Sequence, residues 1–152
     1  MVSALLSPNF TLAELTRTST GLANWPGPME SISLTYLCDR CLEPIRLIVG
    51  GPLRVNSGYR SKAVNERIGG ADGSQHLLGE AADIVTPVPV EDAMRRLADE
   101  VKRGRLTVDQ LIVYPRGGFL HVSYTRFGTN RNQLLRSAAA GGSGGPYSPW
   151  TP

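Results

Sequence analysis

Two histidines and one aspartate are the residues of this chain whose types and spacing could support chemistry. His76 lies in the segment GSQHLLGEAADI, seven residues before Asp83, and His121 follows 38 residues after Asp83 in the segment FLHVS. Imidazole nitrogens and carboxylates are typical zinc ligands, and a catalytic zinc site keeps its fourth position open for water. Water bound to zinc ionises near neutral pH and becomes a nucleophile. The three residues therefore predict a hydrolytic zinc site, whereas the alternative is that each histidine is an ordinary surface or core residue.

The residues around this trio follow a pattern. SQHLLGEAAD reads as S-x-H-x-x-G-x-A-x-D from Ser74 to Asp83, FLHVS places His121 in a later strand, and VNSGYRS stands upstream. In this pattern the chain resembles the zinc D-Ala-D-Ala carboxypeptidases and dipeptidases, the LAS-type peptidoglycan peptidases. It most resembles their small single-domain branch from bacteriophages. The resemblance extends from about Phe10 to Arg136.

The resemblance implies a role for five residues. His76, Asp83 and His121 would be the zinc ligands. Arg60 of SGYRS would point into the cleft, where its planar fork could hold the substrate carbonyl or the developing oxyanion. Taken alone, Arg60 would instead be read as a surface cation. Ser74 would support the His76 loop or bind substrate.

The same resemblance implies the fold and the reaction. The fold would be α+β and like that of the hedgehog and D-Ala-D-Ala peptidase domains. The reaction would be zinc-dependent hydrolysis of peptide bonds, involving D-amino acids, in bacterial peptidoglycan, by a phage lysin or a virion-associated wall-degrading protein. The alternative is a phage structural or adaptor protein that retains the peptidase fold with weak or no catalysis.

The sequence does not identify an obvious general base. Peptidases of this family usually carry a carboxylate shortly before the last histidine ligand, often three residues ahead, and Gly118 occupies that place here. The acidic residues left nearby are Glu80 and Asp109. Both are therefore candidates for the catalytic acid or base.

The predicted hairpin around PRGG offers a third candidate. A tight turn at 116–117 would pair three residues of one strand with three of the next: Tyr114 with Phe119, Ile112 with His121, and Gln110 with Ser123. Paired residues share a face of the sheet, so Tyr114, Gln110 and Ser123 would lie beside His121 as catalytic or substrate-binding residues. Asp109 would lie on the other face, and a bulge or a longer turn would reverse this result. Tyr114 could polarise the zinc water or stabilise the intermediate, but with a pKa of about 10 it is a poor base.

The elements that must position these residues belong to an α+β class. Capping, hydrophobic periodicity and turn residues predict helices, strands and a hairpin in this order: helices at about 12–17 and 33–49, a strand in LRVNSGYR, a helix in SKAVNERI, a strand in GEAADIVT, a helix at 90–104, and a hairpin within 108–125. Pro44 would either kink the long helix or mark the start of a second short helix. Helices come first and strands and helices mix later, which is typical of an α+β fold.

The two cysteines form a single CxxC within the long helix. Cys38 and Cys41 fall on its apolar face, which predicts that both pack in the core as small hydrophobic side chains. A redox role would need the motif at a strand-to-helix junction, which is not predicted here. Two thiolates also cannot complete a four-ligand structural zinc site.

Composition changes near residue 137. The segment SAAAGGSGGPYSPWTP follows the last predicted element, and its Gly, Ser and Pro content predicts a flexible spacer and an extended tail without a core element. We therefore expect a peptidase-like domain at 1–136 and a tail at 137–152. Tyr147 and Trp150 would be aromatic anchors for other virion proteins.

Charge and hydropathy limit the remaining possibilities. The net charge is +3 and 41% of residues are hydrophobic, as in ordinary globular proteins. The cations are scattered and no recognised nucleic-acid motif accompanies them, so we expect no nucleic-acid partner. No apolar run is long enough for a membrane span. The opening MVSALLSPNF lacks a secretion-signal pattern, so we expect synthesis in a host cytoplasm and another route to the cell wall.

Overall fold

A six-stranded sheet organises the chain in the computed structural model, which describes residues 3–140 and 144–152. The strands are ordered β3-β4-β6-β5-β7-β8, and neighbours are antiparallel except for the parallel pair β5 and β7. Their bounds are β3 (Arg54–Ser57), β4 (Ala81–Val85), β5 (Gln110–Tyr114), β6 (Phe119–Ser123), β7 (Gln133–Ser137) and β8 (Tyr147–Pro149). A separate two-stranded sheet joins β1 (Leu5–Ser7) and β2 (Phe10–Thr11). Strands and helices are thus mixed, and the predicted α+β class is confirmed.

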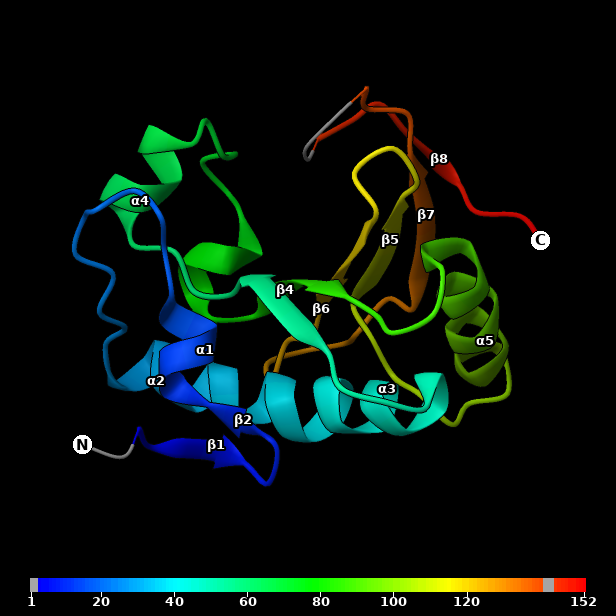
Figure 1. Ribbon diagram of the computed structural model, residues 1–152, viewed down its shortest axis with the longest axis horizontal. Coiled ribbons are helices and arrows are strands. Elements are labelled where there is room, and N and C mark those ends of the chain that lie inside the picture. The colour runs from blue at the N-terminus through cyan, green and yellow to red at the C-terminus, as the bar shows by residue number, and fades with distance from the viewer. Residues whose placement is uncertain (1–2, 141–143) are drawn as a thin grey trace.

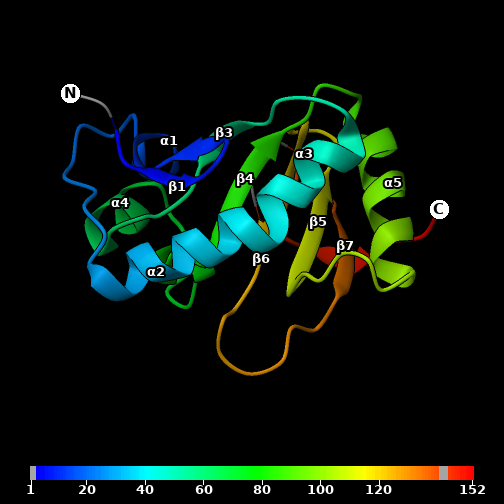
Figure 2. The same ribbon diagram turned by 90° about the horizontal axis from the view of Figure 1, so that it is seen from below.

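Two long helical stretches, residues 28–49 and 90–102, cover one face of the large sheet. Three segments follow one another without a break and cross it diagonally, with α5 beside them (Figure 1, Figure 2): α2 (Pro28–Leu37), the π-helical η1 (Cys38–Leu42) and α3 (Glu43–Val49). The other helical elements are α1 (Leu12–Thr16), α4 (Lys62–Arg67), the 3₁₀ helix η2 (Gln75–Leu78) and α5 (Val90–Lys102). Within the described residues, none of these helices combines the length and apolar composition that a membrane crossing requires.

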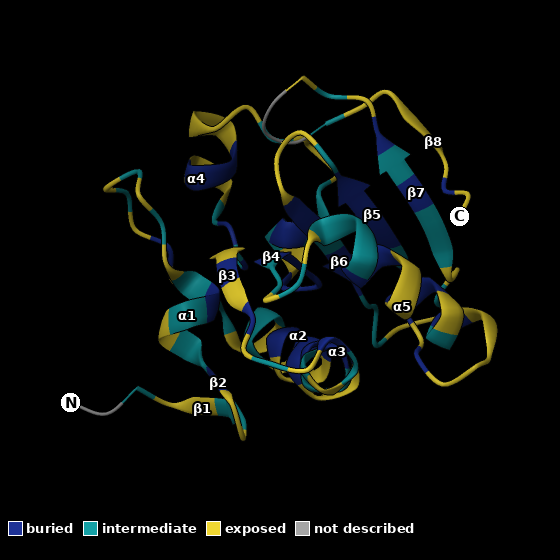
Figure 3. Cartoon of the chain, turned by 45° about the vertical axis from the view of Figure 1, so that its right-hand side comes forward, coloured by how far each residue is buried: buried dark blue, intermediate teal, exposed yellow. Residues whose placement is uncertain are grey.

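The pleat of the central strands separates the core from the site. Side chains alternate between the two faces of a strand, and those that face the helices are fully buried: Ala82, Ile84, Leu111, Val113, Leu120 and Val122. Figure 3 shows buried residues concentrated on these strands and on the inner sides of the helices. Asp83, Tyr114 and His121 alternate with the core residues and therefore emerge on the opposite face, which carries the site.

The long helix differs from its prediction at two points. It begins at Pro28 rather than near residue 33, because proline needs no hydrogen bond at the first helical position. Pro44 lies in the first turn of a second short helix, α3, in agreement with one of the two alternatives, and an unpredicted π-helical turn precedes it, in which the Glu43 N–H donates to the Cys38 carbonyl. Pro44 lacks an N–H and its ring crowds the carbonyl four residues back, and the wider turn accommodates both.

Most other predicted elements are present. The capping box of Thr11 and Glu14 starts α1, and Gly50 ends α3 in the left-handed conformation with φ 79°. The strands predicted around residues 53–60 and 79–86, the short helix between them, the helix after Pro89 and the hairpin correspond to β3, β4, α4, α5 and β5–β6. The buried positions of Cys38 and Cys41, both 0% exposed and free, confirm core packing. Burial raises the pKa of both thiols, which makes them poor nucleophiles.

The expectation that nothing after residue 137 joins the core is wrong. Trp150 is 8% exposed and belongs to the main core cluster. Its backbone N–H donates to the Leu134 carbonyl at 2.9 Å, and the Lys102 ammonium lies 5.2 Å from its ring centroid. A single large aromatic side chain buries enough apolar area to fasten a Gly/Pro-rich segment. Residues 141–143 of the predicted spacer lie outside the described residues, and the division into domain and tail stays a prediction.

Candidate metal centre

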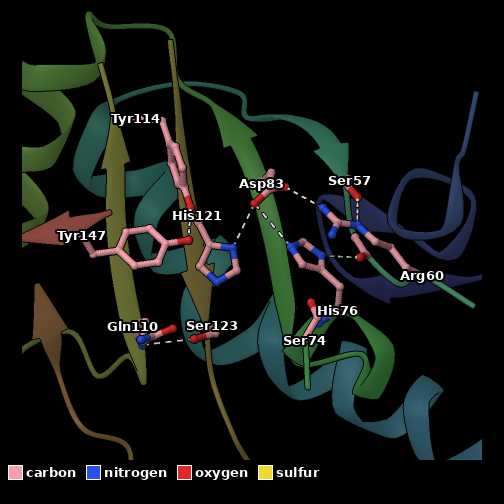
Figure 4. Close-up of polar contacts among 11 residues, drawn as sticks. Ser57, Arg60, Ser74, His76, Asp83, Gln110, Tyr114, His121, Ser123 and Tyr147 are labelled. Atoms are coloured by element: carbon pink, nitrogen blue, oxygen red, sulfur yellow. Dashed lines mark hydrogen bonds and ion pairs between the residues drawn. The ribbon is translucent and has the colours of Figure 1, made fainter. Parts of the chain in front are cut away.

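His76, Asp83 and His121 converge on the open face of the sheet (Figure 4). Asp83 and His121 are direct partners across β4 and β6, which places the His121 Nδ1 atom 2.9 Å from the Asp83 Oδ1 atom. The Nε2 atom of His76 lies 3.4 Å from the same oxygen. One potential ligand atom from each residue falls within 4.8 Å of the other two.

The loop that carries His76 is fixed by local contacts. Ser74 caps η2, and its Oγ accepts the His76 backbone N–H at 3.3 Å, so Ser74 supports the loop. Gly79 ends η2 with φ 70°, and a Cβ there would clash with the Glu30 carbonyl oxygen, so no larger residue fits. The His76 Nδ1 lies 2.7 Å from the Gly58 carbonyl, which can accept only from a protonated Nδ1. This contact leaves Nε2 unprotonated and free to bind a metal.

Arg60 lies beside the carboxylate in the loop after β3. Its Nη2 donates to Asp83 Oδ2 at 3.0 Å and its Nε donates to Ser57 Oγ at 2.9 Å. Both charged side chains are 8% exposed, so a surface position for Arg60 is excluded. Ser57 was not singled out from the sequence, although it lies in the quoted segment VNSGYRS.

The donor set fits a zinc ion in the type of its ligand atoms, in two of its three donor–donor distances, and in the ligand forms of His76 and Asp83. Two ligand atoms that are each about 2.0 Å from a tetrahedral zinc lie about 3.3 Å apart, close to the 2.9 and 3.4 Å found around Asp83 Oδ1. Burial lowers the pKa of His76, which favours the neutral ligand form. Burial alone would raise the pKa of Asp83, but its interactions with His76 and His121 outweigh this effect and lower that pKa well below its usual value.

A cleft of about 580 Å³ opens above the three residues. The loop of residues 69–75 borders one part of it, and Gln110, Tyr114 and Tyr147 border another. Figure 4 shows Arg60 and His76 on one side of Asp83 and the two tyrosines on the other. The metal cluster therefore lies in a cavity large enough to admit part of a peptide.

Tyr114 occupies the position that the hairpin register predicts. Tyr114 pairs with Phe119 and Ile112 pairs with His121, so Tyr114 lies on the His121 face. Its hydroxyl is 3.0 Å from that of Tyr147. Burial, followed by the Tyr147 hydrogen bond, raises the pKa of Tyr114. The phenol is therefore protonated at neutral pH, so it can donate a hydrogen bond but cannot serve as a base.

The two acidic candidates lie outside the cleft lining. Asp109 is 4% exposed, and its carboxylate accepts hydrogen bonds from the Arg131 side chain at 2.9 and 2.7 Å. Glu80 is 7% exposed and accepts from Gln75 Nε2 at 3.3 Å. Both carboxylates are thus engaged by neighbouring side chains, and a catalytic role for either stays a prediction.

The two remaining substrate-binding candidates, Gln110 and Ser123, differ in their access to the cleft. Gln110 borders the cleft, where its Nε2 donates to Gln133 Oε1 at 2.7 Å. Ser123 is 0% exposed and its Oγ accepts the Gln110 backbone N–H, so it cannot touch substrate. Arg131 and Tyr147 border the cleft but were missed as site residues, because the former lies in a loop and the latter in a segment that was read as a detached tail.

An α+β domain with a two-histidine, one-aspartate centre in a cleft has the architecture expected of a metallohydrolase. A family model described as Peptidase M15 matches residues 8–123, and the chain belongs to this family. Over 81 residues it is 36% identical to the zinc D-Ala-D-Ala carboxypeptidase of Streptomyces albus G, a match that covers 50% of this chain and 31% of that relative. The chain thus matches about a third of the relative's length, and the predicted family is confirmed.

Proposed function

We propose that this chain is a zinc-dependent peptidase that hydrolyses peptide bonds, involving D-amino acids, in bacterial peptidoglycan. The observation that carries the proposal is the convergence of His76 Nε2, Asp83 Oδ1 and His121 Nδ1 within 4.8 Å at the floor of the cleft. Membership of the peptidase family supports the reaction type. The substrate class follows from the relative's name, zinc D-Ala-D-Ala carboxypeptidase.

The protein groups around the cluster would stabilise the charge that develops during hydrolysis. A zinc ion held by the three ligands would polarise the scissile carbonyl and supply an activated water. Arg60 is fixed in direction by Ser57 and Asp83 and borders the cleft. Its guanidinium would donate to the carbonyl oxygen as that atom becomes negative, which is the task of an oxyanion donor.

Tyr114 would be a second donor from the opposite wall. Its protonated hydroxyl borders the cleft and is held by Tyr147. The cleft is also lined by several glycines, which leave the backbone open to an extended peptide: Gly69, Gly70, Gly73, Gly144 and Gly145. Backbone exposed in this way suits a substrate that is itself a peptide.

One observation favours a second function. Among the described residues that border the cleft, Asp83 is the only acid, and it is engaged by Arg60 and both histidines. A cleft rich in donors but without a free carboxylate supports slow hydrolysis or none. The second candidate is therefore a structural or adaptor protein that retains the fold and the metal site. A phage origin, as lysin or virion component, also remains a proposal.

Digestion of purified peptidoglycan distinguishes these functions. Fragments are identified by mass spectrometry after incubation with zinc-loaded protein, with chelated protein and with His121→Ala. A peptidase releases new peptide ends only in the first sample. Arg95→Ala is the control, because Arg95 lies on the exposed side of α5 away from the cleft. A wild-type protein that binds zinc in a 1:1 ratio, as expected for a single three-ligand site, but releases no fragment would support the adaptor.

A further inference from the structure

Part of the cleft wall comes from outside the region that defines the family. The family match ends at residue 123, yet Gly144, Gly145 and Tyr147 border the cleft. These residues belong to a segment of the chain that composition alone marks as a detached tail. Its position over the cleft therefore needs an explanation in the contacts that hold it.

The segment is fastened on both sides of Tyr147. β8 pairs with β7 in antiparallel register, with Ser137 opposite Tyr147 and Leu135 opposite Pro149. The Ala138 N–H donates to the Pro146 carbonyl at 3.0 Å. Beyond the strand, the core position of Trp150 holds the chain end. The phenol of Tyr147 is therefore presented at a defined place along the cleft.

Tyr147 contacts the proposed donor Tyr114 directly. Their hydroxyl oxygens are 3.0 Å apart, and their rings meet edge to face with centroids 6.4 Å apart and an interplanar angle of 89°. Tyr147 is nevertheless 47% exposed. One part of the side chain thus holds Tyr114, while another part stays open toward the cleft. A residue that served only to pack the edge strand would need neither feature.

We infer that Tyr147 is a positioning and substrate-contact residue of the peptidase site, an inference that rests on the proposed function. Its hydroxyl fixes the Tyr114 hydroxyl toward the metal cluster, and its ring and the backbone of Gly144 and Gly145 form a wall for the peptide substrate. Because these glycines carry no side chain, an extended peptide can lie close to that wall. The C-terminal segment then completes the cleft instead of attaching the protein to another chain.

The first test separates the hydroxyl from the ring. Tyr147→Phe removes the hydrogen bond and keeps the wall, and we expect kcat on a peptidoglycan peptide to fall about threefold to tenfold, the scale of one net hydrogen bond, with KM nearly unchanged. Tyr147→Ala removes both and should also raise KM. Tyr36→Phe is the matched control, because Tyr36 is an exposed tyrosine of α2 that does not border the cleft.

A double-mutant cycle tests whether Tyr147 acts through Tyr114. If it does, Tyr114→Phe and the double variant Tyr114→Phe/Tyr147→Phe should have the same kcat, because the partner of the lost contact is already gone. Multiplicative losses would overturn the positioning role. Zinc content must stay at the wild-type value in all variants, since neither tyrosine belongs to the metal cluster.

A measurement of peptide binding tests the role of Tyr147 even if the protein cleaves no substrate. If zinc-loaded wild type cleaves nothing, the peptidase proposal fails, and calorimetric titration with an intact D-Ala-D-Ala peptide still reports on the wall. Weaker binding by Tyr147→Ala than by Tyr36→Phe supports the substrate-contact role, and equal binding overturns it. A faster reaction or tighter binding after removal of residues 144–152 would also overturn it, since the segment would then block the cleft.

Discussion

On one wall of the cleft, Arg60, Asp83 and His76 hold one another through buried contacts, whereas on the other Tyr114 and Tyr147 meet through one pair of hydroxyls. The first group lies within the family match, and Tyr147 lies beyond it. In the first group each side chain satisfies another, so losing one leaves a buried charge or donor without a partner. In the second, a lost contact exposes groups that water can reach. We call the first group (Arg60, Asp83 and His76) the metal wall and the second (Tyr114 and Tyr147) the tyrosine wall. Substitutions in the metal wall should therefore cause large losses of stability or activity, and substitutions in the tyrosine wall smaller ones.

The largest effect is expected at Asp83. Asp83→Ala removes a zinc ligand and leaves Arg60 buried without its counter-charge. Breaking one partner of a buried ion pair costs about 3–5 kcal/mol, and we expect a loss of this size in urea unfolding of the chelated protein. Zinc binding should be lost as well, as measured by elemental analysis. If Asp83→Ala retained one zinc per chain and wild-type stability, the metal wall would not depend on its buried charges, and the proposed difference between the two walls would be wrong.

An exposed ion pair, Asp92 with Arg95, is the control for the buried pair of Asp83 with Arg60. Asp92 and Arg95 of α5 are 2.7 Å apart, with side chains 45% and 56% exposed. Because water screens such a pair, Asp92→Ala should cost no more than about 1 kcal/mol. A loss as large as that of Asp83→Ala would mean that burial is not the reason for the difference.

Arg60→Lys tests the metal wall through catalysis. Lysine keeps the positive charge near Asp83 but loses the planar fork that also engages Ser57. We expect a loss of about 2–4 kcal/mol of transition-state stabilisation, as for an oxyanion donor, measured as kcat/KM with zinc content unchanged. Arg54→Lys on the exposed side of β3 is the control. Equal turnover of both variants would remove Arg60 from the mechanism.

Trp150 tests how firmly the tyrosine wall is fastened. Its indole fills part of the core, but the Nε1 group is buried without a partner among the described residues. Trp150→Ala should therefore lower stability by about 2–3 kcal/mol, somewhat below the usual cost of emptying a core aromatic site. Trp150→Phe keeps an aromatic ring and removes the unpaired N–H, so it should cost less than Trp150→Ala. The reverse order in urea unfolding would contradict this account of the anchor.

The metal wall could be predicted from the sequence because its determinants are local or follow from strand register. The spacing around His76 and Asp83 suggested the ligand pattern, and the alternation of β5 and β6 placed Tyr114 beside His121. Asp109 does not border the cleft. Its engagement with Arg131 could not be anticipated, because that contact joins a strand to a loop 22 residues away.

Tyr147, the other half of the tyrosine wall, was missed because the segment that carries it was read as a tail. β8 is only three residues long, and it forms because it has a partner edge in β7 and an anchor in Trp150. Neither can be derived from the composition of GGSGGPYSPWTP, which by propensity alone is a spacer and a tail. The π-helical turn before Pro44 likewise depends on the surrounding helix.

A smaller effect than at Trp150 is expected at Asp109, which lies next to the cleft without bordering it. Hydrogen bonds from Arg131 hold the pKa of Asp109 below its usual value. A carboxyl with a lowered folded-state pKa stabilises the protein above its unfolded pKa of about 3.9, and this contribution is lost as the pH falls through the folded value. Asp109→Asn should thus cost about 1–2 kcal/mol near pH 7. The difference from wild type should vanish in acid.

Urea unfolding of both proteins between about pH 7 and pH 2 measures this convergence. A difference that stays constant with pH would mean that the shape of the side chain, not its charge, supports Arg131. The same variant decides between structure and catalysis, because a general base cannot be replaced by an amide without loss of turnover. Asp109 is engaged by Arg131 and does not itself border the cleft. We therefore expect Asp109→Asn to keep its zinc and most of its kcat, whereas a collapse of kcat at normal stability would return Asp109 to the catalytic site.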